Sequence, residues 1–281
     1  MVKQMEKQIN YYIDKKTEKW IINKLRTAGC VFAEDEARLL ISEAQTLDTL
    51  IGMVEQRATG LPLEHVVGWA DFCGMRIKVE QGVFVPRRRT EFLVQQTSAL
   101  ATPGSVIVDL CCGTGAVGVA LAKIIGYIEL YATDIDPASV RCAYHNTTFI
   151  GGNVYEGDLY HPLPSALHNR VDILVANAPY VPTESIELLP QEARKYEIRA
   201  ALDGGEKGLD VQRRVAAEAP IWLAPGGHLL VETSQKQALQ TAEIFAENGL
   251  IPKVANCVEL DATVVIGTQT NRMNMNCKIL T

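Results

Sequence analysis

Four groups of glycine and polar residues each stand at the end of a short apolar stretch of the chain. They are Asp109 to Gly118 (DLCCGTGAVG), Asp134, Asp158, and Asn177-Ala178-Pro179-Tyr180. In parallel α/β sheets, ligands bind outside the carboxyl ends of the strands. If the apolar stretches are such strands, these four groups lie together and are the candidates for binding and chemistry.

The first two groups predict a nucleoside site. Gly113 and Gly115 allow a tight turn that exposes backbone N–H groups at the start of a helix. Asp134 lies nineteen residues beyond Gly115, where a carboxylate can accept two hydrogen bonds from a ribose diol. An ordinary strand–helix turn is the structural alternative for the glycines, and a strand-end cap is the alternative for Asp134 and Asp158.

The other two groups distinguish between the cofactors that such a site holds. Nicotinamide dinucleotide and S-adenosylmethionine sites share the glycine-rich turn and the acidic residue. A dehydrogenase has no need of Asp158 or of the turn at Asn177, whereas a site that brings a nucleophile to the sulfonium of an adenosyl cofactor does. The residues therefore favour S-adenosylmethionine, and a NAD-dependent oxidoreductase stays as an alternative.

The elements that must position these groups alternate between strand and helix. Predicted helices are Thr90–Leu100, Ala116–Ile125 and one that begins at Pro137 after the cap Asp136. Predicted strands are 106–110, 128–133, 153–156, 171–176, 228–232 and 263–267. Alternation of this kind predicts an α/β fold with a mostly parallel, doubly wound sheet.

The chain before this alternating region has a different character. Apolar residues up to about residue 60, among them Ile21 and Leu25, recur at helical spacing. From Gly60 to Pro86, short apolar stretches are interrupted by glycines, which predicts a hairpin. We therefore expect a helical domain over 1–60, a β-hairpin linker over 61–89, an α/β domain over 90–270 and a loose tail over 271–281.

Composition excludes several classes of protein. Among 281 residues, 47% are hydrophobic and 21% are charged, as in a globular protein with a sizeable core. The net charge of −6 disfavours direct nucleic-acid binding, for which Arg87-Arg88-Arg89 is the sole basic candidate. That triplet is either a solvated turn or a contact to the carboxylate of a cofactor or to the phosphates of a partner.

The apolar runs and the cysteines indicate the cellular compartment of the protein. No apolar run reaches the roughly 18 residues of a membrane span. The seven cysteines include the adjacent pair Cys111 and Cys112 but no C-x-x-C spacing, so we expect neither a disulfide framework nor a metal site. We expect a cytoplasmic protein with no membrane partner, in which the adjacent cysteines fill space.

Six ordered motifs accompany the glycine-rich turn between residues 35 and 267. They are Gly60–Gly68 (GLPLEHVVG), Phe72-x-Gly74, Val85-Pro86-Arg87-x-x-Thr90-Glu91, Asn177-x-Pro179-Tyr180, Ala201–Leu209 (ALDGGEKGL) and Pro225-Gly226-Gly227. With these motifs the sequence resembles the release-factor glutamine methyltransferases, the HemK/PrmC family. The resemblance implies a class I S-adenosylmethionine-dependent methyltransferase fold, Rossmann-like, with a seven-stranded sheet whose last strands form an antiparallel edge.

The resemblance also implies a reaction and its partners. S-adenosylmethionine would be the methyl donor, and S-adenosylhomocysteine would be the product. The acceptor would be the side-chain amide nitrogen of a glutamine in the Gly-Gly-Gln loop of a translation release factor. In that case the helical domain over 1–60 would recognise the protein substrate, and 90–270 would be the methyltransferase domain.

Carried over position by position, the resemblance assigns a role to each group. Cys111 to Gly115 would line the methionine end of the cofactor, Asp134 would bind the ribose, and Asp158 with Leu159 would flank the adenine. The expected cofactor-binding set is Asp109, Cys111, Cys112, Gly113, Thr114, Gly115, Asp134, Asp158, Leu159 and Asn177. The expected catalytic set, which would hold the acceptor, is Asn177, Ala178, Pro179 and Tyr180.

Three features depart from the family pattern. Alanine stands at position 178, where the family has a second proline. Cys111-Cys112 stands where relatives usually carry glycine and a small residue, and the helical segment before Gly60 is shorter than expected. These departures indicate a side branch of the family.

The turn at Asn177 has the chemistry that an amide acceptor needs, because an amide lone pair is delocalised and the nitrogen is a weak nucleophile. The Asn177 side-chain oxygen and the Ala178 carbonyl can accept its two N–H bonds, and Pro179 favours extended geometry at Ala178. The Tyr180 ring can pack on the planar amide or face the sulfonium. The open alternatives are a nucleic-acid amino-methyltransferase acting on adenine N6 or cytosine N4, the oxidoreductase, and a non-catalytic S-adenosylmethionine-binding scaffold.

Overall fold

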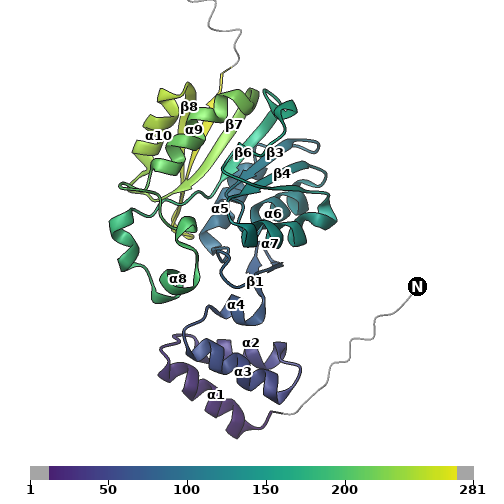
Figure 1. Cartoon of the computed structure of the whole chain (residues 1–281), viewed down its shortest axis with the longest axis vertical. Helices are drawn as coiled ribbons and strands as arrows, with labels where there is room; N and C mark the ends of the chain where they lie inside the picture. Colours follow the sequence, from purple (N-terminus) through teal and green to yellow (C-terminus); the bar gives the residue numbers. More distant parts are fainter. Residues whose placement is uncertain (1–12, 271–281) are drawn as a thin grey trace, which may run out of the picture.

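The computed structural model describes residues 13–270, which form a helical domain and a larger α/β domain (Figure 1). The helical domain contains α1 (Lys15–Thr27), α2 (Ala33–Glu43), α3 (Leu47–Ala58) and the short α4 (Leu63–Val67). Side-chain oxygens of Asp14 and Thr46 cap α1 and α3 by accepting backbone N–H groups. The domain has its own buried core, which includes Ile21, Leu25, Leu40, Leu50 and Val54.

A hairpin follows the helical domain and packs on the sheet domain. Its strands, β1 (Trp69–Phe72) and β2 (Met75–Lys78), pair antiparallel. The hairpin is shorter than the linker expected over 61–89, because residues 63–67 form α4 and the chain after β2 is coil. The Asn146 side chain of α7 (Pro137–Thr147) bonds both the N–H and the carbonyl of Lys78, which holds the hairpin against the α/β domain.

The α/β domain is built on a seven-stranded sheet with the order β5-β4-β3-β6-β7-β9-β8. The strands are β3 (Val106–Leu110), β4 (Glu129–Asp134), β5 (Asn153–Glu156), β6 (Val171–Ala176), β7 (Leu223–Thr233), β8 (Leu250–Cys257) and β9 (Ala262–Gln269). Neighbours from β5 to β7 pair parallel, whereas β9 is antiparallel to both β7 and β8. The predicted α/β fold with a mostly parallel sheet and an antiparallel edge is confirmed.

Helices cover both faces of the sheet (Figure 1). On one face lie α5 (Glu91–Ser98), α6 (Ala116–Ile125) and α7, and on the other lie α9 (Asp210–Trp222) and α10 (Ala238–Glu247). Successive side chains of β3 pack on opposite faces of the sheet. Ile107 packs with α5 and α6, whereas Val108 and Leu110 pack with α9 and α10. Because the strand order reverses between β3 and β6, the carboxyl ends of these strands are the expected ligand site.

Three elements differ from the sequence prediction. β8 is absent from it, because this edge strand buries only Leu250 and has no strong apolar pattern. β7 begins five residues earlier than predicted, since Pro225-Gly226-Gly227 continues the strand across a register shift with β6. The helix predicted at Thr90–Leu100 is α5 preceded by the 3-10 turn η1 (Arg88–Thr90), and the predicted tail over 271–281 lies outside the described residues.

The described helices are short. The longest, α1 and α9, have 13 residues each, whereas a membrane-spanning helix needs about 20. Within residues 13–270, no helix combines the length and the apolar character needed to cross a bilayer. The cytoplasmic location stays a prediction.

Candidate active site

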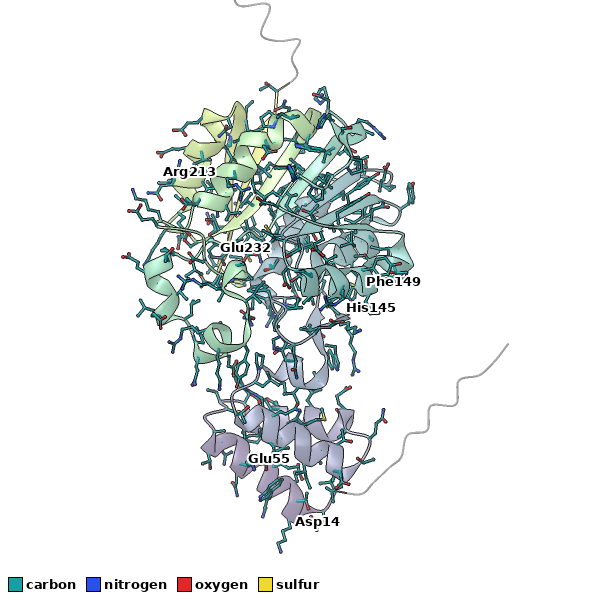
Figure 2. The ribbon with its side chains drawn as sticks, in the orientation of Figure 1. Asp14, Glu55, His145, Phe149, Arg213 and Glu232 are labelled. Atoms are coloured by element: carbon teal, nitrogen blue, oxygen red, sulfur yellow. The ribbon has the colours of Figure 1, made fainter. Side chains whose placement is uncertain are left out.

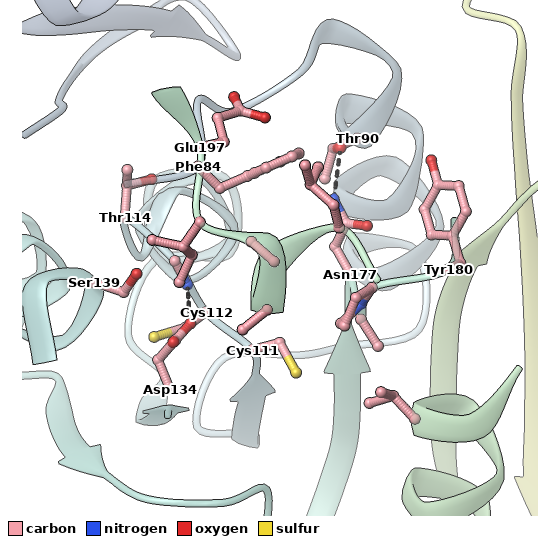
Figure 3. A pocket seen from close by; sticks show the side chains of 18 of the residues that line it. Phe84, Thr90, Cys111, Cys112, Thr114, Asp134, Ser139, Asn177, Tyr180 and Glu197 are labelled. Carbon is pink, nitrogen blue, oxygen red and sulfur yellow. Dashed lines mark hydrogen bonds between the residues drawn. The ribbon is translucent and has the colours of Figure 1, made fainter. Parts of the chain in front are cut away.

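A cavity of about 620 Å³ opens at the carboxyl ends of β3, β4 and β6. Its walls contain all of the predicted site residues except Gly115. Further walls come from the segment before α5, residues 84–90, and from residues 189–203, which include the short helix α8 (Gln191–Tyr196). Figure 3 shows side chains of three of the predicted groups, at Cys111, Asp134 and Asn177, around one space, and Asp158 also lines this cavity. The fold therefore brings the four predicted groups together.

The glycine-rich turn needs a backbone conformation that most residues avoid. Cys111, Gly113 and Gly115 have φ angles of +55°, +53° and +74°. A Cβ on Gly115 would lie 3.3 Å from the Ala143 backbone, so the close approach of α7 also requires glycine there. Glycine would adopt the left-handed conformation of Cys111 without strain, so a cysteine at this position carries a conformational cost.

The carboxylate of Asp134 joins the turn to the next strand. Its Oδ2 accepts the Gly113 N–H at 2.8 Å, and its Oδ1 accepts the Asp136 N–H at 2.9 Å. Asp134 lines the cavity, and a carboxylate oxygen can accept more than one hydrogen bond. Burial raises the pKa of this carboxyl, which is only 9% exposed. Asp134 is therefore a strand-end cap and at the same time a candidate acceptor for a diol.

Asp109, at the end of β3, is a buried acid with an unused hydrogen-bonding position. Its side chain is buried, its Oδ2 has no hydrogen-bond partner among the described residues, and a backbone hydrogen bond from Gly118 reaches the carboxyl. Burial raises the pKa of Asp109 to about 7, with the Asp134 charge adding to the effect. A cationic ligand group in the cavity would stabilise the charged form and supply the missing partner.

The end of the cavity at Asp158 combines an ion pair with apolar walls. Asp158 binds Arg214 of α9 at 2.6 Å, and both residues line the cavity. Leu159, Ile135 and Val211 form the apolar part of this end. A flat heterocycle with polar edges suits such surroundings.

The turn after β6 holds the amide of Asn177 in one orientation. Its Nδ2 donates to the Thr90 hydroxyl at 3.2 Å, as Figure 3 shows, and its side-chain oxygen has no hydrogen-bond donor among the described residues. The Tyr180 hydroxyl donates to Glu232 at 3.2 Å, and the Arg89 guanidinium lies 5.8 Å from the centre of the Tyr180 ring. The turn therefore offers the cavity a free carbonyl oxygen beside a fixed aromatic ring.

Glycines and a glutamine support this turn from behind. A Cβ on Gly204 would lie 2.7 Å from the Pro179 carbonyl oxygen, and a Cβ on Gly208 would lie 2.2 Å from that of Tyr180. The Gln237 side chain donates to the Tyr180 carbonyl at 3.0 Å. The motif Ala201–Leu209 thus allows a close backbone contact that fixes the turn at Asn177.

Two residues of the basic triplet, Arg87 and Arg89, line the cavity. Arg87 pairs with Glu197 at 2.5 Å, and Arg89 pairs with Glu232 at 3.5 Å; both carboxylates are buried. Only Arg88 is exposed without a described charge partner. The triplet therefore combines two properties: Arg88 and Arg89 are exposed in a 3-10 turn, and the guanidinium groups of Arg87 and Arg89 compensate buried negative charge.

Comparisons with known proteins agree with this geometry. Residues 74–191 match the Methyltransferase small domain family. A crystal structure of a methyltransferase from Pyrococcus furiosus superimposes with a TM-score of 0.53, at 16% identity, over 70% of this chain and 90% of that one, which shows a shared fold. The release factor glutamine methyltransferase of Geobacter sulfurreducens is 37% identical over 70% of this chain and 69% of its own length. This chain belongs to the release factor glutamine methyltransferase family.

The names of this chain's relatives include more than one acceptor. A relative from Streptomyces pristinaespiralis, named 4-amino-L-phenylalanine/4-methylamino-L-phenylalanine methyltransferase, is 32% identical to this chain. The match covers 70% of this chain and 69% of the relative. The fold and the methyl-transfer chemistry are therefore shared more widely than the acceptor.

The cavity residues of this methyltransferase fit S-adenosylmethionine, the donor that the family implies. The unpartnered oxygen of Asp109 suits the ammonium of the methionine part, and the lone pairs of Asp134 suit a ribose diol. The apolar end beside Asp158 suits adenine. When bound, S-adenosylmethionine supplies an electrophilic methyl group on a sulfonium.

Several residues of the site were outside the sequence prediction. They are Thr90, Glu197, Arg214 and Glu232. Thr90 stands in a motif that carried the resemblance, so a signal for it was present. Glu232 had a weaker signal, a charged residue at the end of an otherwise apolar strand.

Proposed function

We propose that this protein transfers the methyl group of S-adenosylmethionine to the side-chain amide nitrogen of a protein glutamine, and that a peptide-chain release factor carries this glutamine. Family membership supports the reaction. The observation that carries the proposal is the fixed Asn177 amide: its nitrogen is bound by Thr90, and its oxygen is free at the cavity. A free acceptor of this kind is what the N–H of an incoming carboxamide requires.

Asn177 and Ala178 orient the acceptor. The Asn177 oxygen accepts one N–H of the glutamine amide and the Ala178 carbonyl accepts the other, which directs the nitrogen lone pair away from both. Pro179 restricts Ala178 to extended geometry, so the direction of this carbonyl is fixed although proline is absent at 178. The Tyr180 ring, held by Glu232, packs against the planar amide.

The rate enhancement arises mainly from alignment. Holding two reactants in line can supply roughly 7–11 kcal/mol in favourable cases. The amide nitrogen becomes acidic once it carries the additional methyl group, so its proton can leave to water after transfer. The chain then needs no strong base beside Asn177.

Contacts between the helical domain and the cavity wall support a role of this domain in presenting a protein substrate. Arg57 of α3 binds Glu192 at 2.6 Å, and the Tyr196 hydroxyl donates to the Thr59 carbonyl at 3.0 Å. Glu192 lines the cavity, so the wall over residues 189–203 is tied directly to the helical domain. We therefore assign residues 13–60 to recognition of the protein that carries the acceptor glutamine.

Transfer to a purified release factor tests the proposal. The protein is incubated with S-adenosylmethionine carrying a labelled methyl group, and the product is digested and sequenced by mass spectrometry. The expected result is a gain of about 14 Da on the glutamine of the Gly-Gly-Gln loop, the mass of one CH₂. A release factor with asparagine in place of that glutamine is the control and is expected to gain nothing. Labelling of other residues at equal rate would contradict the proposal.

A second candidate is N-methylation of an aromatic amine, which the relative from Streptomyces pristinaespiralis supports. Phe84 and Tyr180 give the cavity the aromatic surfaces that such a ring would contact. 4-Amino-L-phenylalanine added to the same assay distinguishes the two, because an aromatic-amine enzyme would methylate it in preference to the release factor. RNA and DNA in a third reaction test the nucleic-acid alternative.

A further inference from the structure

The three arginines of the basic triplet have different surroundings, and the proposed reaction gives no role to Arg87. Arg89 pairs with Glu232, which lies in the interior of the α/β domain (Figure 2). Arg88 is exposed and is not part of the cavity wall. The Arg87 side chain lines the cavity and is 35% exposed, so its guanidinium group is accessible to a bound ligand.

Arg87 is connected to the turn that is expected to hold the acceptor. Its carbonyl accepts the Thr90 N–H at 2.9 Å, which closes the 3-10 turn η1, and the Thr90 hydroxyl accepts the Asn177 amide at 3.2 Å. The Arg87 guanidinium binds Glu197, the C-cap residue of α8, at 2.5 Å. Arg87 therefore joins the turn at Asn177 to the cavity wall that contacts the helical domain.

Two contacts hold the Arg87 guanidinium in one place. Its Nη2 donates to Glu197 Oε1, and the same oxygen accepts the Val85 N–H at 3.2 Å, so one carboxylate fixes both the side chain and the backbone of this segment. The Phe84 ring centre lies 5.1 Å from Arg87 Cζ, and Figure 3 shows Phe84 and Glu197 next to each other. A guanidinium has five N–H donors, and the others have no hydrogen-bond acceptor within residues 13–270. Arg87 is thus a fixed fork with unused donors.

The charge of Glu197 determines which kind of group Arg87 can bind. The Glu197 side chain is fully buried, and its Oε2 has no hydrogen-bond partner among the described residues. Its negative charge is compensated by Arg87. An anionic group at Arg87, such as the carboxylate of the cofactor, would bring a second negative charge close to Glu197. A neutral carbonyl oxygen accepts the same N–H groups without this repulsion.

We propose that Arg87 binds main-chain carbonyl oxygens of the peptide segment that carries the acceptor, with Glu197 as its positioning residue. The segments that hold this ion pair contribute mainly apolar side chains to the cavity wall, among them Phe84, Pro86, Leu189, Pro190 and Ile198. Such a wall suits a segment without charged side chains, and carbonyl groups beside glycine are accessible because glycine has no side chain. The proposal rests on the proposed function, because it assumes a peptide as the acceptor.

The test measures how a short peptide with Gly-Gly-Gln at its centre binds to the protein saturated with S-adenosylhomocysteine, which has no methyl group to transfer. Arg87→Lys keeps a positive charge beside Glu197 but loses the planar fork. It is expected to weaken peptide affinity and to raise KM about tenfold, with kcat and cofactor affinity within about twofold of the wild type. Arg88→Lys makes the same change at the exposed neighbour and is expected to have no effect.

A modified peptide tests the contact itself. Sulfur in place of a carbonyl oxygen is a weaker hydrogen-bond acceptor, and it is introduced in turn at each peptide bond beside the glutamine. At the carbonyl that Arg87 binds, this change is expected to weaken peptide affinity about 3- to 10-fold in the wild type but at most about twofold in Arg87→Lys.

Two variants test the positioning by Glu197. Glu197→Gln still accepts N–H groups, whereas Glu197→Leu does not. The glutamine variant is therefore expected to bind the peptide at least about threefold more tightly than the leucine variant. S-adenosylmethionine affinity, measured on both, is expected to be unchanged and shows that the fold is intact.

The failure of this proposal is distinguishable from the failure of the proposed function. Equal peptide affinity in the wild type and Arg87→Lys, or a wild type that does not bind the peptide, would overturn the role of Arg87. A loss of S-adenosylmethionine affinity in Arg87→Lys at unchanged peptide affinity would overturn it as well and assign Arg87 to the cofactor carboxylate. If the wild type transfers nothing to glutamine, the proposed function fails, and the binding measurements still decide the role of Arg87.

Discussion

The Gly113 N–H donates a 2.8 Å hydrogen bond to the Asp134 carboxylate, which fixes the turn after β3 to the end of β4. Asn at position 134 would turn an NH₂ group toward one of the two backbone donors that this carboxylate accepts. We expect Asp134→Asn to weaken S-adenosylmethionine binding about 10- to 100-fold, as measured by calorimetry, because an unpaired buried donor costs about 1–3 kcal/mol.

Asp136→Asn is the matched control for this change. Asp136 caps α7 through the Ser139 N–H, and asparagine caps helices about as well as aspartate. Its effect on the affinity is expected to stay within about twofold. Equal losses in the two variants would mean that the loop conformation, and not the Asp134 carboxylate, governs binding.

The pKa of Asp109, raised by burial to about 7, predicts that cofactor binding depends on pH. The charged form attracts a cationic donor and the neutral form does not, so S-adenosylmethionine affinity is expected to rise between about pH 6 and pH 8. Titrations in buffers of different ionisation enthalpy are expected to show proton release on binding below pH 7. In Asp109→Asn, both effects should vanish, and a pH dependence that survives this change would assign it to another group.

The same pKa predicts how the stability of the free protein depends on pH. The folded pKa of Asp109 lies above the usual value of 3.8, so folding favours the protonated form. Its contribution to stability is therefore fully present below about pH 4 and is lost as the pH rises through about 7. Thermal unfolding of Asp109→Asn against the wild type measures this, and the variant is expected to gain relative stability as the pH increases over that window.

A Cβ added at Gly208 would lie 2.2 Å from the Tyr180 carbonyl oxygen. We therefore expect a side chain at position 208 to slow methyl transfer without weakening cofactor binding. Gly208→Ala is expected to displace the turn at Asn177 and to lower kcat by about 100-fold, the effect of a misplacement near 1 Å. S-adenosylmethionine affinity should change little, because Gly208 lies outside the cavity wall.

Gly52→Ala in α3 is the matched control. No atom lies within 4 Å of its added Cβ, so a stability gain of about 0.8–1.0 kcal/mol is expected, with cofactor affinity unchanged. A loss of cofactor binding in Gly208→Ala equal to its loss of transfer would contradict a role confined to the turn.

The ion pair between Arg57 and Glu192 predicts that KM for the release factor depends on the helical domain. Glu192→Gln weakens this bond while leaving the Arg57–Glu36 pair, and it is expected to raise KM for the release factor about 3- to 10-fold with cofactor affinity unchanged. Glu187→Gln, which weakens the exposed pair with Arg194 in the same segment, is the control and should have no effect on KM. Equal KM values for the two variants would remove the support for substrate recognition by residues 13–60.

The site residues that could be predicted from the sequence are those that stand at the carboxyl end of a strand. Asp134 ends β4 and Asn177 follows β6, two strands with clear apolar patterns, and parallel pairing then places both residues at one edge of the sheet. The glycine-rich turn was recognisable because its backbone angles exclude most side chains. These features depend on local spacing and on one topological rule.

The partners of these residues could not be predicted in this way. Thr90 and Asn177 are separated by 87 positions, and Tyr180 and Glu232 by 52. Only the packing of α5 and β7 beside β6 determines that they meet. The ion pairs of Arg87 and Arg89 were missed for the same reason, since a run of three arginines is typical of an exposed turn.

The central claim is that the turn at Asn177 holds a carboxamide for methylation. Its most direct test is transfer from labelled S-adenosylmethionine to a release factor by the wild type and by Asn177→Ala, with cofactor affinity measured on the same preparations. The account predicts methylation of the Gly-Gly-Gln glutamine by the wild type, and an Asn177→Ala protein that binds the cofactor normally but transfers at least about 100-fold more slowly. Equal transfer by the two proteins would contradict it.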